Sequence, residues 1–181
     1  HTRKKVEEII EEPVSLDVEI INIIQFLQEL GKDAVLKGKT VSMKGLKAGC
    51  YYGCLLLRPN DIPRFDDPED PSSMEEIIKL LDVEPVSWNY KTECCGGSHS
   101  IPHKDIAVDL SKKIIDDAVK HGADIIVVAC PMCHSNLDMR QTEMVKYAGY
   151  KKTPVLYLTE LIGLSLGLSP EELELNLHFI E

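Results

Sequence analysis

The 181-residue sequence lacks a basic cluster, a membrane-length apolar run and a recognisable secretory signal. Its formal net charge is −10, so no basic surface is available to neutralise nucleic-acid phosphates, which argues against DNA or RNA as partners. The basic residues at positions 3–5 are followed by a charged stretch and not by an apolar segment. We therefore expect a soluble cytoplasmic protein with no transmembrane segment, although a peripheral place on a membrane complex stays open.

Internal repeats and low-complexity tracts are also missing. Hydrophobic residues make up 44% of the sequence and charged residues 28%, which is ordinary for one soluble domain with its own core. We divide the chain into a helical extension or linker over residues 1–45 and a single domain over 46–181. Within the extension, residues 17–31 have apolar side chains near helical spacing, whereas residues 32–45 are polar and resemble a linker.

Strand and helix patterns alternate along the larger segment. Residues 124–129 form the continuous apolar run of a strand buried on both faces, and residues 103–121 have the apolar stripe of a helix. A shorter strand is predicted at 84–88, and Ser72 with Glu75 predicts a capping box before another helix. This alternation predicts an α/β fold, with a doubly wound, mostly parallel sheet flanked by helices and preceded by the N-terminal helical extension.

The six cysteines fall into three close pairs, each at or just after a predicted strand. They are Cys50, Cys54, Cys94, Cys95, Cys130 and Cys133. A secreted framework of three disulfides is disfavoured, because the core is large enough without it and adjacent cysteines pair under strain. Since the carboxyl ends of parallel strands share one edge of a sheet, we expect the three pairs to converge there around one metal or iron–sulfur site.

The number of cysteines leaves open which kind of metal centre they would bind. Cys130-Pro131-Met132-Cys133 is a C-x-x-C motif, which by itself also fits a redox pair. Four thiolates suffice for tetrahedral zinc or a cubane cluster, whereas five or six are present here. The excess indicates a larger or unusual cluster, or one spare cysteine. Ligation by sulfur alone favours iron–sulfur or zinc over magnesium, calcium or manganese.

Three segments together resemble the cysteine-rich CCG domain family, and within it the B subunits of heterodisulfide reductases. They are the run from Tyr51 to Pro59, Cys94-Cys95-Gly96-Gly97, and the run from Cys130 to Asp138. The resemblance implies that a noncubane [4Fe-4S] cluster is held by Cys54, Cys94, Cys95, Cys130 and Cys133. Members of that family carry two such domains, so this chain, with one set, resembles a C-terminal half or a one-domain relative. Cys50 lies outside the motif and is interpreted as a buried strand cysteine.

The resemblance also implies a function. It predicts an oxidoreductase subunit that takes electrons from iron–sulfur and flavin subunits of a hetero-oligomeric complex and passes them to a small disulfide, giving two thiols. One alternative is an electron relay in a dehydrogenase or quinone oxidoreductase. Another is a structural zinc-binding CCG domain that docks subunits.

Other polar residues near the cysteines have both functional and structural interpretations. The histidines His99, His103 and His134 are interpreted as outer-sphere hydrogen-bond donors to sulfur, as proton donors to a nascent thiolate, or as surface residues. The cations Arg58, Lys91 and Lys104 either attract an anionic disulfide or are solvated surface charges.

Overall fold

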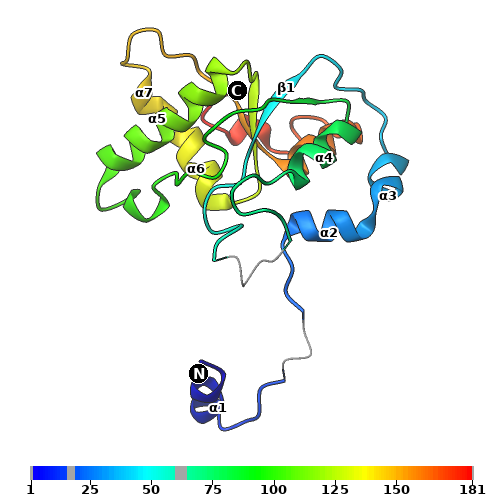
Figure 1. The fold of residues 1–181 in the computed structure, drawn as a ribbon, viewed down its shortest axis with the longest axis vertical. Coiled ribbons are helices and arrows are strands. Elements are labelled where there is room, and N and C mark those ends of the chain that lie inside the picture. Colours follow the sequence, from blue (N-terminus) through cyan, green and yellow to red (C-terminus); the bar gives the residue numbers. More distant parts are fainter. Residues whose placement is uncertain (1, 16–18, 60–64, 181) are drawn as a thin grey trace.

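The computed structural model describes residues 2–15, 19–59 and 65–180 (Figure 1). Helices and parallel strands alternate over most of this length. In chain order the elements are α1 (Thr2–Ile10), α2 (Ile23–Leu30), α3 (Lys32–Lys37), β1 (Lys47–Tyr51), α4 (Ser73–Leu80), β2 (Glu84–Pro85), the 3-10 helix η1 (Gly97–His99), α5 (Lys104–Lys120), β3 (Ile125–Val128), α6 (Pro131–Met139), α7 (Gln141–Met144), β4 (Val155–Tyr157), α8 (Leu158–Ser165) and the 3-10 helix η2 (Leu175–Leu177).

The four described strands form one sheet in the order β2-β1-β3-β4, and every pair in it is parallel. In the register of the sheet, Cys50 of β1 lies opposite Val127 of β3, which lies opposite Leu156 of β4. Each link between sequential strands contains at least one helix, as parallel pairing requires. The predicted α/β fold with a mostly parallel sheet is confirmed.

The strand order reverses between β1 and β3. The connection that leaves β1 through α4 goes to β2 on one side, and the connection that leaves β3 through α6 goes to β4 on the other. The loops after β1 and β3 therefore diverge, which opens a crevice at the carboxyl edge of the sheet. Open α/β sheets bind their ligands at this switch point.

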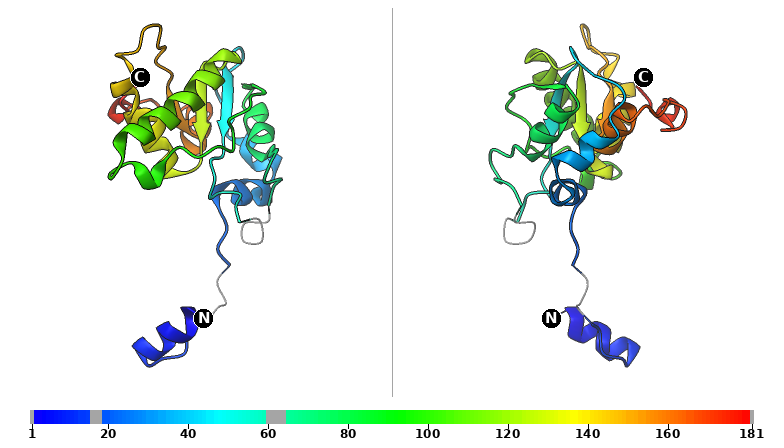
Figure 2. Two further views of the ribbon diagram at one scale, coloured as in Figure 1. Left: turned by 60° about the vertical axis from the view of Figure 1, so that its left-hand side comes forward. Right: turned by 90° about the vertical axis from the view of Figure 1, so that its right-hand side faces the viewer.

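Helices cover both faces of the sheet, because side chains of successive strand residues point to opposite faces (Figure 2). Ala48, Cys50 and Tyr52 pack in one core cluster with apolar residues of α2, α3, α4 and α8. Tyr51 and Ile126 pack in the other cluster with apolar residues of α5, α6 and α7. All four residues of β3 are buried, as its continuous apolar sequence predicted.

The N-terminal segment differs from its prediction. The predicted helix over 17–31 is shorter, because Asn22 begins α2 with a capping box in which its side chain and that of Gln25 bond each other's backbone N–H. Residues 16–18 lie outside the described part of the chain. The polar segment 32–45 was expected to be a linker, but it contains α3, whose Val35 is buried in the core. Helix α1 buries no residue and stands clear of the sheet layers in Figure 1.

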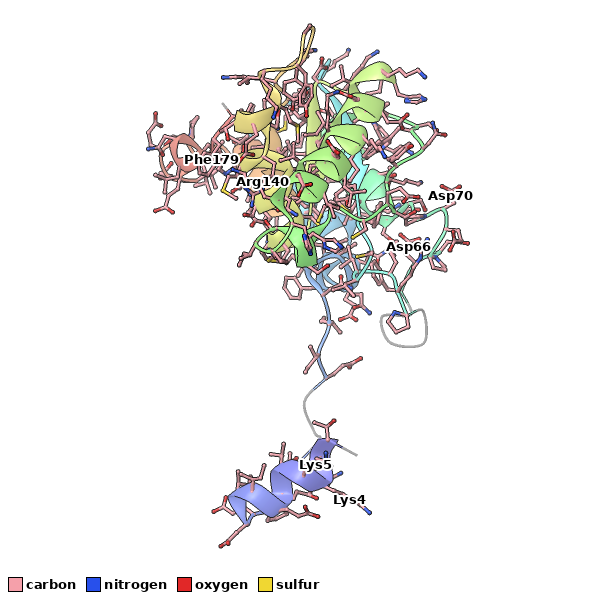
Figure 3. All side chains as sticks on the ribbon, turned by 90° about the vertical axis from the view of Figure 1, so that its left-hand side faces the viewer. Lys4, Lys5, Asp66, Asp70, Arg140 and Phe179 are labelled. Carbon is pink, nitrogen blue, oxygen red and sulfur yellow. The ribbon has the colours of Figure 1, made fainter. Side chains whose placement is uncertain are left out.

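Two further predictions about the β1–β2 region need correction. The side chain of Ser72 does not cap α4; the carboxylate of Asp66, labelled in Figure 3, accepts hydrogen bonds from the backbone of Ser72 and Ser73 at 3.0 and 2.8 Å. The strand predicted over 84–88 is only two residues long. It ends near Pro85, which has no N–H, and the indole of Trp88 instead donates to the carbonyl of Cys50 at 3.2 Å.

Candidate metal-cluster site

Five of the six cysteines line one cavity of about 440 Å³ at the carboxyl edge of the sheet. They come from three loops: Cys54 follows β1, Cys94 and Cys95 precede η1, and Cys130 and Cys133 begin α6. The other lining residues are largely apolar, and they are Tyr52, Leu55, Leu56, Gly97, Ser98 and Met132. The structure thus brings together the three cysteine groups that are far apart in the sequence.

The end of β1 holds the loop that carries the adjacent cysteines. The backbone N–H groups of Tyr52 and Gly53 donate to the carbonyl of Lys91 at 2.8 and 3.2 Å, and the Tyr51 hydroxyl donates to the carbonyl of Glu93 at 2.6 Å. The Tyr52 hydroxyl accepts from the backbone of Met74 and donates to the Glu75 carboxylate. The Tyr51 side chain and the backbone of Tyr52 and Gly53 therefore fix the position of residues 91–93, and with them Cys94.

Asn136 fixes Cys95 from the other side. Its amide nitrogen lies 3.1 Å from the carbonyl oxygen of Cys95 and 3.7 Å from the Cys95 sulfur. The hydroxyl of Ser100 donates to the Asn136 amide oxygen at 2.8 Å, while Arg140 donates to the carbonyl and the hydroxyl of Ser100. Because Arg140 can only donate, the Ser100 hydroxyl must give its hydrogen to Asn136, which turns the amide nitrogen toward Cys95.

The first turn of α6 presents the C-x-x-C pair. Cys130 is the N-cap residue and Cys133 lies in the first turn, with its sulfur 3.6 Å from that of Cys95. The backbone N–H groups of Cys133 and Met132 donate to the Cys130 sulfur. Free N–H groups and the helix dipole both favour negative charge at this end of a helix, so the turn stabilises thiolates.

Hydrogen bonds among the sulfurs distribute the thiol protons unevenly. Hydrogen bonding with Cys133 is the main cause that lowers the pKa of Cys130 to about 6 and that of Cys95 to about 7. The same contacts with Cys130 and Cys95 raise the pKa of Cys133. Burial, followed by the nearby Cys94, raises the pKa of Cys54. Two sulfurs of the cavity therefore have thiolate character near neutral pH.

The donor set fits a thiolate-bound metal centre. The sulfurs approach from three sides, and Gly96 donates its backbone N–H to the Cys94 sulfur at 3.3 Å. Gly53 has φ +68°, and a Cβ at this position would lie 2.9 Å from the Cys133 sulfur, so a side chain here would enter the space that the sulfurs surround. Sulfur-only donors in an apolar cavity suit an iron–sulfur cluster or zinc.

Cys50 and the three histidines do not line this cavity. Cys50 is fully buried in the core on the α4 face of the sheet, which agrees with its interpretation as a strand cysteine. His134 is buried beside Tyr157 and His178, and its Nε2 atom lies 3.0 Å from the carbonyl of Val155. His99 and His103 are neighbours of each other near η1.

The cations expected at the rim are paired with carboxylates of the protein. Arg58 bonds Glu69 at 3.0 Å, and Lys104 bonds Glu143. Lys91 lies 2.5 Å from Asp70, a residue labelled in Figure 3. The exposed pairs of Arg58 and Lys104 match the interpretation as surface charge, whereas the Lys91 side chain is only 16% exposed and is held within the protein. The described lining of the cavity contains no charged nitrogen.

Sequence reasoning missed the groups that support the cysteines. Asn136 lies three residues after Cys133, and this spacing on a helix places both side chains on one face. The sequence therefore contained a signal for the role of Asn136. Gly53 and Ser100 carry no comparable signal, because their importance depends on which loops the fold brings together.

A four-stranded parallel sheet with a thiol-lined cavity at its switch point defines an α/β protein with a cysteine-rich site. The chain belongs to the CCG cysteine-rich domain family, whose model matches residues 48–138 and so includes all five cysteines of the cavity. A crystal structure of a hypothetical protein from Helicobacter pylori has the same fold, with a TM-score of 0.71 at 10% identity over 98% of this chain and 32% of that one.

Two relatives are components of redox enzymes. The 8-methylmenaquinol:fumarate reductase membrane anchor subunit of Wolinella succinogenes is 36% identical over 140 residues, which cover 77% of this chain and 49% of that protein. The B subunit of the ferredoxin:CoB-CoM heterodisulfide reductase of Methanosarcina mazei is 31% identical over 167 residues, covering 90% and 55%. The chain thus spans about half the length of these curated relatives. Among its described residues, no helix combines the length and apolarity that a bilayer crossing requires.

Proposed function

We propose that Cys54, Cys94, Cys95, Cys130 and Cys133 hold a noncubane [4Fe-4S] cluster in an oxidoreductase subunit. The observation that carries this proposal is the convergence of five thiols from three loops on one cavity. Five sulfurs exceed what a tetrahedral zinc or a cubane cluster requires. The adjacent Cys94 and Cys95 both line the cavity and would hold the cluster from a single loop.

The surrounding residues supply the environment that such a centre needs. The apolar side chains of Leu55, Leu56 and Met132 line the cavity, and Leu55 and Met132 are 81% and 53% exposed, so the cavity mouth is apolar and open. The amide of Asn136 and the N-terminal turn of α6 donate hydrogen bonds to sulfur. Donors to sulfur stabilise added negative charge, and so they raise the reduction potential of the site.

We propose that the substrate of the assembled complex is a small disulfide. The support comes from the similarity to the B subunit of a heterodisulfide reductase and from the open, apolar and thiol-lined cavity. When bound, the cluster supplies electrons, so that one disulfide, two electrons and two protons give two thiols. In this proposal the electrons come from iron–sulfur and flavin subunits of a hetero-oligomeric complex in the cytoplasm.

A second candidate is favoured by the similarity to a subunit of a menaquinol:fumarate reductase. In that case the same site relays electrons between a quinone or dehydrogenase partner and another subunit, and no substrate enters the cavity. The absence of cations from the described lining agrees with this candidate as well as with an uncharged disulfide.

Metal analysis and spectroscopy of anaerobically purified protein test the cofactor. About four irons per chain with an iron–sulfur EPR signal would support the cluster, whereas one cysteine-bound zinc and no iron would support a structural zinc domain. The disulfide and relay candidates are then separated with the intact complex. Disulfide-dependent oxidation of the reduced site supports the first, and quinone-dependent oxidation without disulfide turnover supports the second.

A further inference from the structure

Three metal-binding side chains outside the cysteine cavity meet on the opposite flank of α6. They are His134 in α6, Glu160 in the first turn of α8 and His178 just after η2, and one ligand atom from each lies within 4.8 Å of the others. The segment that contains His178 and Phe179 lies beside α6, whose C-cap residue is Arg140 (Figure 3). None of the three residues lines the cysteine cavity.

We propose that these residues form a zinc site that anchors the C-terminal segment to the domain. Two imidazoles and one carboxylate are a ligand set that zinc takes with tetrahedral geometry, leaving one position for water. In such a site the ligand atoms lie roughly 3.3 Å apart, given bonds of about 2.0–2.1 Å. The Nε2 atom of His178 already lies 3.2 Å from Oε1 of Glu160, and one ligand atom from each of the three residues lies within 4.8 Å of the others.

In His134 and Glu160, one of the two possible ligand atoms already has a hydrogen-bond partner in the backbone. The Nε2 atom of His134 lies 3.0 Å from the carbonyl of Val155, which can only accept, so Nε2 carries the hydrogen and Nδ1 keeps a free lone pair. Likewise, Oε2 of Glu160 accepts from the backbone N–H of Tyr157 at 2.8 Å. Bonds of this kind to a carbonyl or another outer partner orient histidine and carboxylate ligands at metal sites.

Packing holds the site together and leaves it accessible. The His134 ring stacks on Tyr157 with centroids 4.2 Å apart and meets the His178 ring edge-on at 4.6 Å. The His178 and Glu160 side chains are only 10% and 14% exposed. A pocket of about 400 Å³ has His178 in its lining together with Pro154 and Leu156, so this side of the site borders an open space.

The site would strengthen an attachment that the fold already contains. The buried carboxylate of Asp138 accepts from the backbone of Phe179 and Ile180 at 2.8 and 3.0 Å. Asp138 and His134 both lie on α6, one turn apart. A zinc ion held by His178 would therefore add a second link between this short segment and the domain, next to the first.

The test compares zinc binding with iron binding in the full chain. The anaerobically iron-reconstituted protein is dialysed against zinc, and both metals are measured by mass spectrometry in wild type, His178→Gln, Glu160→Gln and the surface control His121→Gln. We expect one zinc per wild-type and control chain in addition to the iron. Each of the two ligand variants should bind zinc at least about tenfold more weakly, with iron unchanged.

Cobalt as the probe ion distinguishes the two sites even when a variant folds poorly. Cobalt bound by nitrogen and oxygen gives weak visible absorption, whereas cobalt on thiolates adds an intense charge-transfer band. The weak spectrum in wild-type protein supports the proposal. Zinc retention by both ligand variants, or a wild-type spectrum that contains only the thiolate band, overturns it. Zinc and iron are measured separately, so the zinc result can be interpreted even if the protein holds no iron–sulfur cluster.

Discussion

The amide nitrogen of Asn136 lies within hydrogen-bonding distance of both the carbonyl oxygen and the sulfur of Cys95, at 3.1 and 3.7 Å. A single side chain on α6 therefore positions the loop that carries the adjacent cysteines and also bonds to one of their sulfurs. The orientation of its amide follows from the chain of donors that runs from Arg140 through Ser100. This relationship links the first turns of α6 to the centre of the cavity.

Replacement of Asn136 by leucine should lower the reduction potential of the reconstituted cluster. A lost hydrogen bond to sulfur of about 1 kcal/mol corresponds to roughly 40 mV for one electron. An EPR-monitored redox titration measures the shift. Asn136→Gln, which retains an amide donor, should recover part of it. An unchanged potential in the leucine variant would show that the 3.7 Å contact has no electronic effect.

Serine in place of Cys94 or Cys95 should weaken iron retention, because each substitution removes one soft ligand from the cavity. We expect at least about tenfold faster loss of iron to a chelator in either variant. Cys50→Ser is the matched control, since Cys50 is buried on the other side of β1 and does not line the cavity. Full iron retention in both cavity variants would refute the assigned ligands.

Alanine at Gly53 should damage the site beyond its cost to folding. Its φ of +68° is strained for any side chain by about 1–2 kcal/mol, and its Cβ would lie 2.9 Å from the Cys133 sulfur. Gly122→Ala carries similar strain, with φ +92°, but has nothing within 4 Å. Urea unfolding should show comparable destabilisation of both variants, while iron analysis should show loss only in Gly53→Ala. Equal iron content in the two would mean that the cavity tolerates the methyl group.

Alanine at Asp66 should destabilise the domain, whereas alanine at Ser72 should have little effect. The Asp66 carboxylate accepts from two backbone N–H groups at the start of α4, and the Ser72 side chain makes no capping bond. Loss of such a cap costs about 1 kcal/mol. Thermal and urea unfolding of the two variants measure the difference. A larger destabilisation in Ser72→Ala than in Asp66→Ala would contradict this and favour the capping box that the sequence pattern predicts.

Local patterns predicted most of the central elements. The apolar run before Cys130 is β3, and the stripe over 103–121 is α5, whose buried residues include Ile114, Ile115 and Ala118. Both signals are strong because burial on a sheet or along a helix face imposes a period on the sequence itself. Short elements were harder. Helix α3 has six residues and exposes most of them, so its polar sequence resembles a linker.

The N-terminal end of α4 shows why a local sequence pattern can also mislead. Ser72 and Glu75 have the spacing of a capping box, yet it is Asp66, six and seven residues upstream, that accepts from the backbone N–H groups of Ser72 and Ser73 at this helix end. The competition between two oxygens for one helix end depends on the path of the loop, which the spacing does not encode. Similarly, His134 follows a cysteine directly in sequence, but helical geometry turns its ring toward β4 and His178.

The sequence by itself determined that this chain carries three cysteine groups in or after strands of a parallel sheet. Strand periodicity and the strand-then-cysteine order are local properties, and parallel pairing places strand ends at a common edge. Only the tertiary structure decided how these thiols come to share a cavity, because the strand order β2-β1-β3-β4 sets β1 beside β3 and opens the switch point between them. It also decided that Asn136 reaches Cys95 across 41 residues of sequence.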